Sequence, residues 1–259
     1  MLDDDRIRAA ERSLREMLEV ENLEGKTFLD IGSGSGLSSL AARRMGAKVY
    51  SFDYDPRSVA CTAELRRRFF PDDSDWVVAQ GSALDTRYLS TLGTFDIVYS
   101  WGVLHHTGAM WLGIENAINR VTGGGQLFIA IYNDQSYKSR AWWLVKWFYN
   151  VLPRPLNTIY ANTLGLFTYG VNILKYTIKL KPMIAIRPLL EYKQYKQKRG
   201  MSFMHDLIDW IGGFPYEFTL YEVLEQYMQV RGFALVRGTA ATSLGCHEMI
   251  FKKIETADR

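Results

Sequence analysis

The stretch FLDIGSGSG, from Phe28 to Gly36, decides the fold. An apolar run leads into a loop with glycines at positions 32, 34 and 36, which lets a backbone come close to a ligand. A Walker-type phosphate loop is excluded because no lysine follows Gly36. The dinucleotide pattern G-x-G-x-x-G also fails, because its third glycine would stand at Leu37. The loop predicts a ligand that lies against the backbone, with a plain turn as the alternative.

Apolar runs typical of strands alternate with helical patterns along the chain. This spacing predicts βαβ units that form a parallel sheet with helices on both faces. Such connections are right-handed, so the carboxyl ends of the strands share one edge, where ligands bind. The expected strands are Thr27–Ile31, Lys48–Asp53, Trp76–Ala79, Phe95–Ser100, Gln126–Tyr132, Phe233–Gly238 and Glu248–Lys252, and the expected helices are Ser38–Met45, Arg57–Phe69, Gly113–Val121 and Leu220–Val230.

Polar residues follow the next three strands at this edge. The second strand ends at Asp53 in VYSFDYDP, where a carboxylate can accept hydrogen bonds from both hydroxyls of a ribose. The third strand runs into QGSALD, where Ser82 and the neighbouring backbone can meet the polar edge of an adenine. The fourth continues into FDIVYSWGVLHHTG.

These four segments, in this order, resemble the class I S-adenosylmethionine-dependent methyltransferases over residues 25–133 and 218–253. The resemblance implies an α/β fold with a Rossmann-like seven-stranded sheet, six strands parallel and the last antiparallel. It implies S-adenosylmethionine as the cofactor, with a NAD-binding oxidoreductase as the lesser alternative. The implied cofactor-binding residues are Asp30, Gly32, Ser33, Gly34 and Gly36 at the methionine part, Asp53 and Tyr54 at the ribose, Ser82 and Ala83 at the adenine, and Ser100 and Trp101 after the fourth strand.

Methyl transfer needs an aligned nucleophile, and a hydroxyl acceptor also needs a base. His105 and His106 follow the fourth strand, so either can face the methyl group or only pin its loop. His205 and Asp209 stand one helical turn apart and form either an oriented base or a solvated helix face. The expected catalytic residues are His105, His106, His205, Tyr216 and Glu217, with His247 at the start of the last strand as a further candidate.

A metal site is not expected. Asn133 and Asp134 end the fifth strand in IYND, where catechol-type methyltransferases place Asp-Asn ligands. Those enzymes have another Asp after the fourth strand, but this chain has Ser100 and Trp101 there. The two cysteines lack metal-ligand spacing, and Cys61 in SVACTA is expected to be a buried thiol. Since neither a disulfide framework nor a signal peptide is recognisable, the cytoplasm is the expected location.

The charge is divided between an acidic body and a basic insertion. The chain has 259 residues, of which 47% are hydrophobic, which suits one globular domain with a large elaboration. Between Asp134 and Met204 there are 12 lysines and arginines and two acids, whereas the remainder has 19 basic and 26 acidic residues. The expected domains are a methyltransferase core, 1–133 and 217–259, and an inserted, largely helical subdomain, 134–216.

The insertion is rich in aromatic residues, with Trp142, Trp143 and Trp147 beside a narrow polar stripe of Lys146 and Asn150. It is interpreted first as a lid over the substrate, then as an element at a membrane interface, and last as an RNA-binding surface. A membrane span is rejected, because the uncharged run 155–174 contains asparagines, threonines and glycines.

The segments IYNDQSYKSR, YNVLPRP and DWIGGFPYE resemble a subgroup of bacterial methyltransferases similar to the ubiquinone-biosynthesis methylases. Members often occur beside glycan-assembly genes. The resemblance implies O-methylation of a small-molecule or lipid-linked acceptor, such as a quinol or a glycan sugar. An RNA methyltransferase and a non-catalytic docking module that binds the cofactor are the alternatives. The expected partner is the acceptor, and nucleic acid is not expected. Peripheral contact of the insertion with the inner membrane face is an open alternative, and no oligomeric state is predicted.

Overall fold

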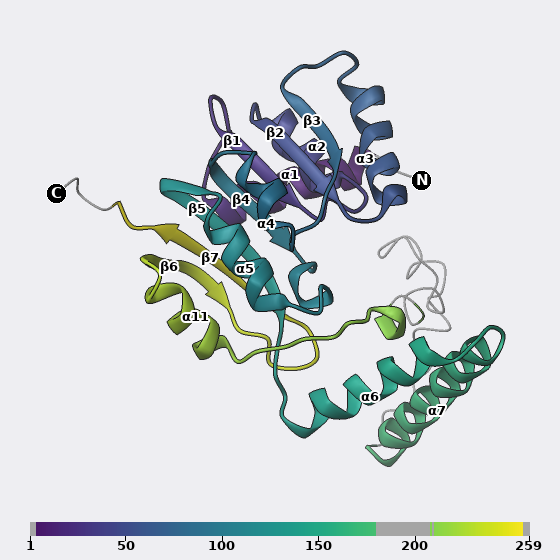
Figure 1. Ribbon diagram of the computed structural model, residues 1–259. Helices are drawn as coiled ribbons and strands as arrows, with labels where there is room; N and C mark the ends of the chain where they lie inside the picture. Colours follow the sequence, from purple (N-terminus) through teal and green to yellow (C-terminus); the bar gives the residue numbers. More distant parts are fainter. Residues whose placement is uncertain (1–3, 180–207, 209, 256–259) are drawn as a thin grey trace. The chain divides into compact units, whose positions relative to one another are not determined.

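The computed structural model describes residues 4–179, 208 and 210–255 (Figure 1). The chain divides into two compact units, an insertion unit over Ser136–Tyr216 and a core unit over Leu2–Gln135 and Glu217–Arg259. Within the described residues, no helix is both long and apolar enough to cross a bilayer.

The core unit is built on one seven-stranded sheet with the order β3-β2-β1-β4-β5-β7-β6. β7 pairs antiparallel with both β5 and β6, and the remaining neighbours are parallel. This confirms the predicted Rossmann-like sheet of six parallel strands and one antiparallel strand. The strands are β1 Thr27–Ile31, β2 Lys48–Asp53, β3 Trp76–Gln80, β4 Phe95–Trp101, β5 Val121–Tyr132, β6 Phe233–Thr239 and β7 Cys246–Lys253.

Helices cover both faces of the sheet and create two apolar clusters (Figure 1). One cluster joins β-strand side chains to helices α1, α2 and α3, through residues such as Leu14, Leu40 and Leu65. The other joins them to α4, α5 and α11, through Leu89, Ile114 and Leu224. The helix bounds are α1 Asp4–Leu18, α2 Leu37–Arg44, α3 Pro56–Phe69, α4 Thr86–Ser90, α5 Met110–Ile118 and α11 Tyr221–Gln229, with a 3-10 turn η1 over Leu104–His106.

Three expectations from the sequence are wrong. The strand expected at Gln126–Tyr132 begins five residues earlier, at Val121, because the pairing of β4 with β5 starts at Phe95 and Val121. The helix expected at Gly113–Val121 begins and ends three residues earlier, and Val121 is already the first residue of β5. Cys61 is exposed rather than buried, because α3 turns Thr62 and Leu65 toward the sheet and Cys61 lies outside that face.

The insertion unit contains two long helices, α6 Tyr137–Val151 and α7 Leu156–Ile178, that pack side by side (Figure 1). The Phe148 and Tyr160 rings meet edge to face at 5.2 Å, and the Tyr160 hydroxyl donates to the Val145 carbonyl. His205 and Asp209, which are predicted to pair as an oriented base, lie outside the described residues.

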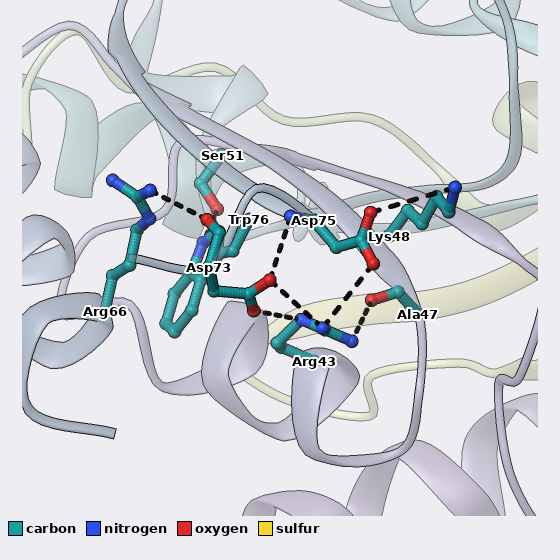
Figure 2. Close-up of polar contacts among 8 residues, drawn as sticks. All are labelled: Arg43, Ala47, Lys48, Ser51, Arg66, Asp73, Asp75 and Trp76. Atoms are coloured by element: carbon teal, nitrogen blue, oxygen red, sulfur yellow. Dashed lines mark hydrogen bonds and ion pairs between the residues drawn. The ribbon is translucent and has the colours of Figure 1, made fainter. Parts of the chain in front are cut away.

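An arginine fork ties the end of α2 to the turn before β3 (Figure 2). Arg43 donates from Nε to one Asp73 carboxylate oxygen at 2.5 Å and from Nη2 to the other at 3.2 Å. Its Nη1 reaches the Ala47 carbonyl, while the Asp75 N–H donates to Asp73. Both side chains of the pair are mostly buried, so this contact is shielded from solvent screening.

We expect Arg43→Lys to lower the free energy of unfolding by about 1–2 kcal/mol, because an ammonium cannot reproduce the fork. Arg43 holds the pKa of Asp73 below its ordinary value, so the pair stabilises the protein above the unfolded pKa. The difference in the free energy of unfolding between variant and wild type should shrink as the pH falls through the pKa of Asp73 in the folded protein. Urea denaturation at pH 7 and pH 3 measures this. Arg67→Lys, in an exposed pair with Glu64, is the matched control and should leave the midpoint unchanged.

Candidate functional site

The glycine loop between β1 and α2 is bonded directly to the end of β2. The Gly32 and Ser33 N–H groups both donate to the Phe52 carbonyl, at 2.9 and 3.0 Å. The Gly34 N–H donates to the Asp53 carboxylate at 2.9 Å. The loop is therefore a fixed backbone surface at the carboxyl edge of the sheet.

Gly32, Gly34 and Gly36 all have a positive φ, but the space around their Cα atoms differs. A Cβ on Gly32 would lie 2.5 Å from Val103, and one on Gly36 would lie 2.8 Å from Thr62 Cα. These two glycines permit close packing. A Cβ on Gly34 would meet nothing nearer than 4.0 Å, so Gly34 leaves open a space that any side chain would fill.

A pocket of about 200 Å³ opens over this loop. Its described lining contains a buried carboxylate and several hydroxyls but no lysine or arginine, so it suits a cationic ligand better than a phosphate. An ammonium or sulfonium centre, both present in S-adenosylmethionine, fits this lining. The pocket is lined by Asp30, Gly32, Ser33, Gly34, Ser35, Leu37, Ser38, Tyr99 and Trp101.

Asp30 ends a buried chain of side-chain hydrogen bonds. Trp76 Nε1 donates to Ser51 Oγ at 2.9 Å, as Figure 2 shows. Ser51 donates to Ser39 Oγ at 2.7 Å, and Ser39 donates to Asp30 Oδ2 at 2.5 Å. Burial raises the pKa of Asp30 to about 7, with a smaller contribution from the Asp53 charge, although the Ser39 bond opposes the shift.

We expect the affinity for S-adenosylmethionine to fall roughly tenfold between pH 8 and pH 6, since a pKa of about 7 leaves Asp30 mostly neutral at the lower pH. Because the folded pKa lies above the unfolded one, Asp30 also lowers stability as the pH rises from about 4 to 7. Titration calorimetry at several pH values measures the first effect. Asp30→Asn should bind more weakly and with a flat pH profile; a steep profile in that variant would contradict the assignment.

The remaining predicted cofactor residues lie at the same edge, but not in the pocket lining. Asp53 accepts the Gly34 and Asp55 N–H groups with its two carboxylate oxygens, each at 2.9 Å. Tyr54 is exposed directly after it. Ser82 accepts the Leu84 N–H, and the Ala83 carbonyl accepts from Asn116. Their roles at ribose and adenine remain predictions.

Tyr99 of β4 lines the pocket, although the sequence motifs do not predict it. Trp101 lines the pocket and donates to Glu248, whereas Ser100 is buried and donates to the Ile31 carbonyl. Tyr99 lies two positions before Trp101, on the same strand face, and also lines the pocket. The period of two along the strand is the signal that could have identified Tyr99. Burial raises its pKa, which keeps the phenol neutral and able to donate.

The two histidines after β4 have different environments. His105 is buried, and its Nδ1 accepts the Tyr132 N–H at 3.3 Å. Its ring lies 3.9 Å from the Tyr132 ring and 4.5 Å from the His106 ring. His106 is half-buried, so it is the more accessible of the two. This arrangement suits a positioning role for His105 and leaves His106 as the candidate base.

The other catalytic candidates have structural contacts. Glu217 caps α5, because its carboxylate accepts the Met110 N–H at 3.0 Å. Tyr216 is buried in the insertion unit, where Lys146 Nζ lies 4.9 Å from its ring centroid. His247 is buried, its Nδ1 accepts the Ala241 N–H at 3.1 Å, and burial lowers its pKa. His205 lies outside the described residues.

No cluster of metal-ligating side chains occurs among the residues that the structure describes. At the position of the metal alternative, Asn133 Nδ2 donates to the Ala241 carbonyl at 2.9 Å. The Asp134 N–H donates to Thr219. These bonds connect the end of β5 to neighbouring loops.

Residues 2–162 match the family model described as a methyltransferase domain. The chain is 30% identical over 134 residues to a ubiquinone biosynthesis O-methyltransferase of Rhizobium johnstonii, covering 49% of this chain and 50% of the relative. It is 40% identical over 84 residues to a ribosomal protein L11 methyltransferase of Prochlorococcus marinus, covering 32% and 28%.

The fold is shared with solved methyltransferase structures. The magnesium protoporphyrin IX methyltransferase of Synechocystis, solved with bound SAH, superposes with a TM-score of 0.54 at 13% identity, covering 98% of this chain and 89% of that one. The chain spans about half the length of the first curated relatives that it matches. Because the family model covers more than half of this chain, the chain belongs to the methyltransferase-domain family, as a class I methyltransferase whose cofactor is S-adenosylmethionine.

Proposed function

We propose that this chain methylates an oxygen atom of a small-molecule or lipid-linked acceptor of quinol or glycan type, in the cytoplasm or at the inner membrane face. The observation that carries the proposal is the histidine pair after β4, one imidazole buried and one accessible. An acceptor hydroxyl must lose a proton, and an imidazole has the pKa for that task near pH 7. The similarity to the ubiquinone biosynthesis O-methyltransferase supports the same acceptor chemistry.

Different residues of the chain bind the cofactor, accept the proton and position the base. When bound, S-adenosylmethionine supplies a methyl carbon that its sulfonium activates. Asp30, Gly32 and Gly34 hold the methionine end in the pocket, and Asp53 holds the ribose. His106 takes the proton from the acceptor oxygen. His105 fixes the His106 loop, because its ring is held at Tyr132 and its carbonyl accepts the Glu217 N–H at 2.9 Å.

The acceptor class can be tested with radiolabelled S-adenosylmethionine and fractionated cell extract. We expect the label to enter a lipid or small-molecule fraction as an ether that resists mild base. Label confined to RNA or protein would overturn the proposal. Tight cofactor binding with no turnover in any fraction would support the docking-module alternative.

The base can be tested with His106→Gln. We expect kcat to fall by about 10²–10⁴-fold while the affinity for S-adenosylmethionine stays unchanged, since His106 is assigned to the acceptor and not to the cofactor. The acidic limb of the kcat/KM profile should also disappear. His247→Gln, which replaces another histidine of the core unit, is the matched control and should retain that limb. Full activity in His106→Gln would remove this residue from the mechanism.

A further inference from the structure

Helix α6 buries two of its polar side chains and exposes three of its large aromatic ones, Trp143, Trp147 and Phe148. The buried residues of α6 are Ser139 and Lys146. Lys146 Nζ donates to the Trp210 carbonyl and lies 4.7 Å from the Trp210 ring centroid. Trp143 and Trp147 stack at 6.4 Å with nearly parallel rings, and Trp147 is 42% exposed. An ordinary surface helix has the opposite arrangement, with its apolar stripe inward.

Helix α7 also exposes large apolar side chains. Leu166, Phe167 and Leu174 are 73%, 67% and 61% exposed, and Ile178 is 73% exposed. With 3.6 residues per turn, these side chains and exposed Val171 fall within about 140° of the helix circumference. No charged residue falls within that arc. The apolar face is defined as these five α7 side chains together with exposed Trp143 and Trp147 of α6, the helix packed beside it. Seven large exposed apolar side chains on two packed helices are more than the scattered single residues that are normal on a surface.

The charges around the apolar face have a single sign. From Ser136 to Lys179 the sequence contains no Asp or Glu. The basic side chains in the helices and their connection, other than buried Lys146, are exposed. These side chains are Lys138, Arg140, Arg154, Lys175 and Lys179.

We infer that the apolar face docks on the surface of an anionic phospholipid bilayer. Tryptophan and large aliphatic side chains enter the interfacial region, while the surrounding lysines and arginines meet the lipid phosphates. A second copy of the chain fits less well, because pairing two such faces would bring like charges together. The helices lie on the bilayer and do not cross it, in agreement with the absence of a span among the described residues.

This inference is independent of the acceptor, so it is tested without turnover. The full chain is mixed with vesicles of phosphatidylcholine alone or with 30% phosphatidylglycerol, and binding is measured by sedimentation and tryptophan emission. We expect binding with a blue shift on the anionic vesicles only. It should weaken as the screening length falls from about 10 Å at 0.1 M salt to about 3 Å at 1 M. Equal binding to both vesicle types, or none, would overturn the inference.

Variants separate the apolar contribution to vesicle binding from the electrostatic one. Phe167→Glu should weaken vesicle binding at least roughly tenfold, because an exposed aromatic ring no longer enters the interface. Lys175→Gln with Lys179→Gln should weaken it about 30-fold, equivalent to about 1 kcal/mol per basic residue. Val230→Glu, at an equally exposed apolar site at the end of α11, is the matched control and should bind like wild type.

Two measurements keep the result unambiguous. Cofactor affinity and thermal unfolding should match wild type in all variants, since the substituted side chains are exposed. Sedimentation velocity tests the competing occupant. A concentration-dependent dimer that Phe167→Glu abolishes, together with no vesicle binding by wild type, would assign the apolar face to a second copy.

Discussion

Gly32→Ala should lower the free energy of unfolding by about 2–5 kcal/mol and abolish measurable cofactor binding. Two costs add. Gly32 has a φ of +77°, a region that costs an L-residue about 1–2 kcal/mol. Its new Cβ would lie 2.5 Å from Val103, and overpacking of this kind costs about 1–3 kcal/mol. A shift of the loop away from Val103 displaces Gly32, Ser33 and Gly34, which line the pocket.

Two control substitutions separate these costs. Gly93→Ala has the same strain, with a φ of +76°, but no atom within 4 Å of the new Cβ. It should lose only about 1–2 kcal/mol and retain full cofactor affinity. Gly123→Ala has neither a positive φ nor a neighbour within 4 Å and should be close to neutral. Chemical denaturation and titration calorimetry measure all three. If Gly32→Ala behaves like Gly93→Ala, the contact with Val103 is not restrictive.

Asp53→Ala should weaken S-adenosylmethionine binding by about 10–150-fold, the equivalent of about 1.5–3 kcal/mol for hydrogen bonds to a charged group. The sequence already predicts the contact with the ribose. The structure adds a second cause, because the same carboxylate accepts the Gly34 N–H and so holds the loop. Loss of the side chain therefore removes a ligand contact and loosens the backbone surface on which the ligand lies.

A comparison of ligands isolates the ribose contact. Wild type should bind S-adenosylhomocysteine more tightly than its 2′-deoxy analogue, whereas Asp53→Ala should bind both alike. Asp55→Ala, which removes the N-cap of α3 two residues later, should still discriminate between them. Equal discrimination by Asp53→Ala and wild type would show that Asp53 acts only through the loop.

Much of the core could be predicted from the sequence, because its signals are local. β1 and β2 have the predicted bounds, since each is an apolar run closed by the loop glycine or by Asp53. The start of α5 could not be predicted in this way. Its N-cap residue is Ala109, which has no capping side chain, and the cap comes from Glu217 far along the chain. A cap supplied through tertiary structure leaves no mark beside the helix.

In the insertion, the helix pattern of the sequence does not predict which side chains of α6 are buried. Lys146 and Asn150 form the polar stripe of α6, and a polar stripe ordinarily faces water. Here Lys146 is fully buried under Trp210, while Trp147 is exposed. The other member of the stripe, Asn150, is exposed. The periodicity identifies the stripe but not the burial of Lys146, because a buried ammonium needs carbonyl and ring partners that come from elsewhere in the chain.

The chain of hydrogen bonds that ends at Asp30 can run in only one direction. An indole N–H is a donor and never an acceptor, so Trp76 fixes the orientation of the Ser51 hydroxyl, which in turn fixes that of Ser39. A proton relay needs a chain that can reverse, and this one cannot. Asp30 must therefore exchange its proton through the mouth of the pocket. A ligand that fills the pocket would trap the ionisation state in which it was bound, and exchange with buffer would then wait for the ligand to leave.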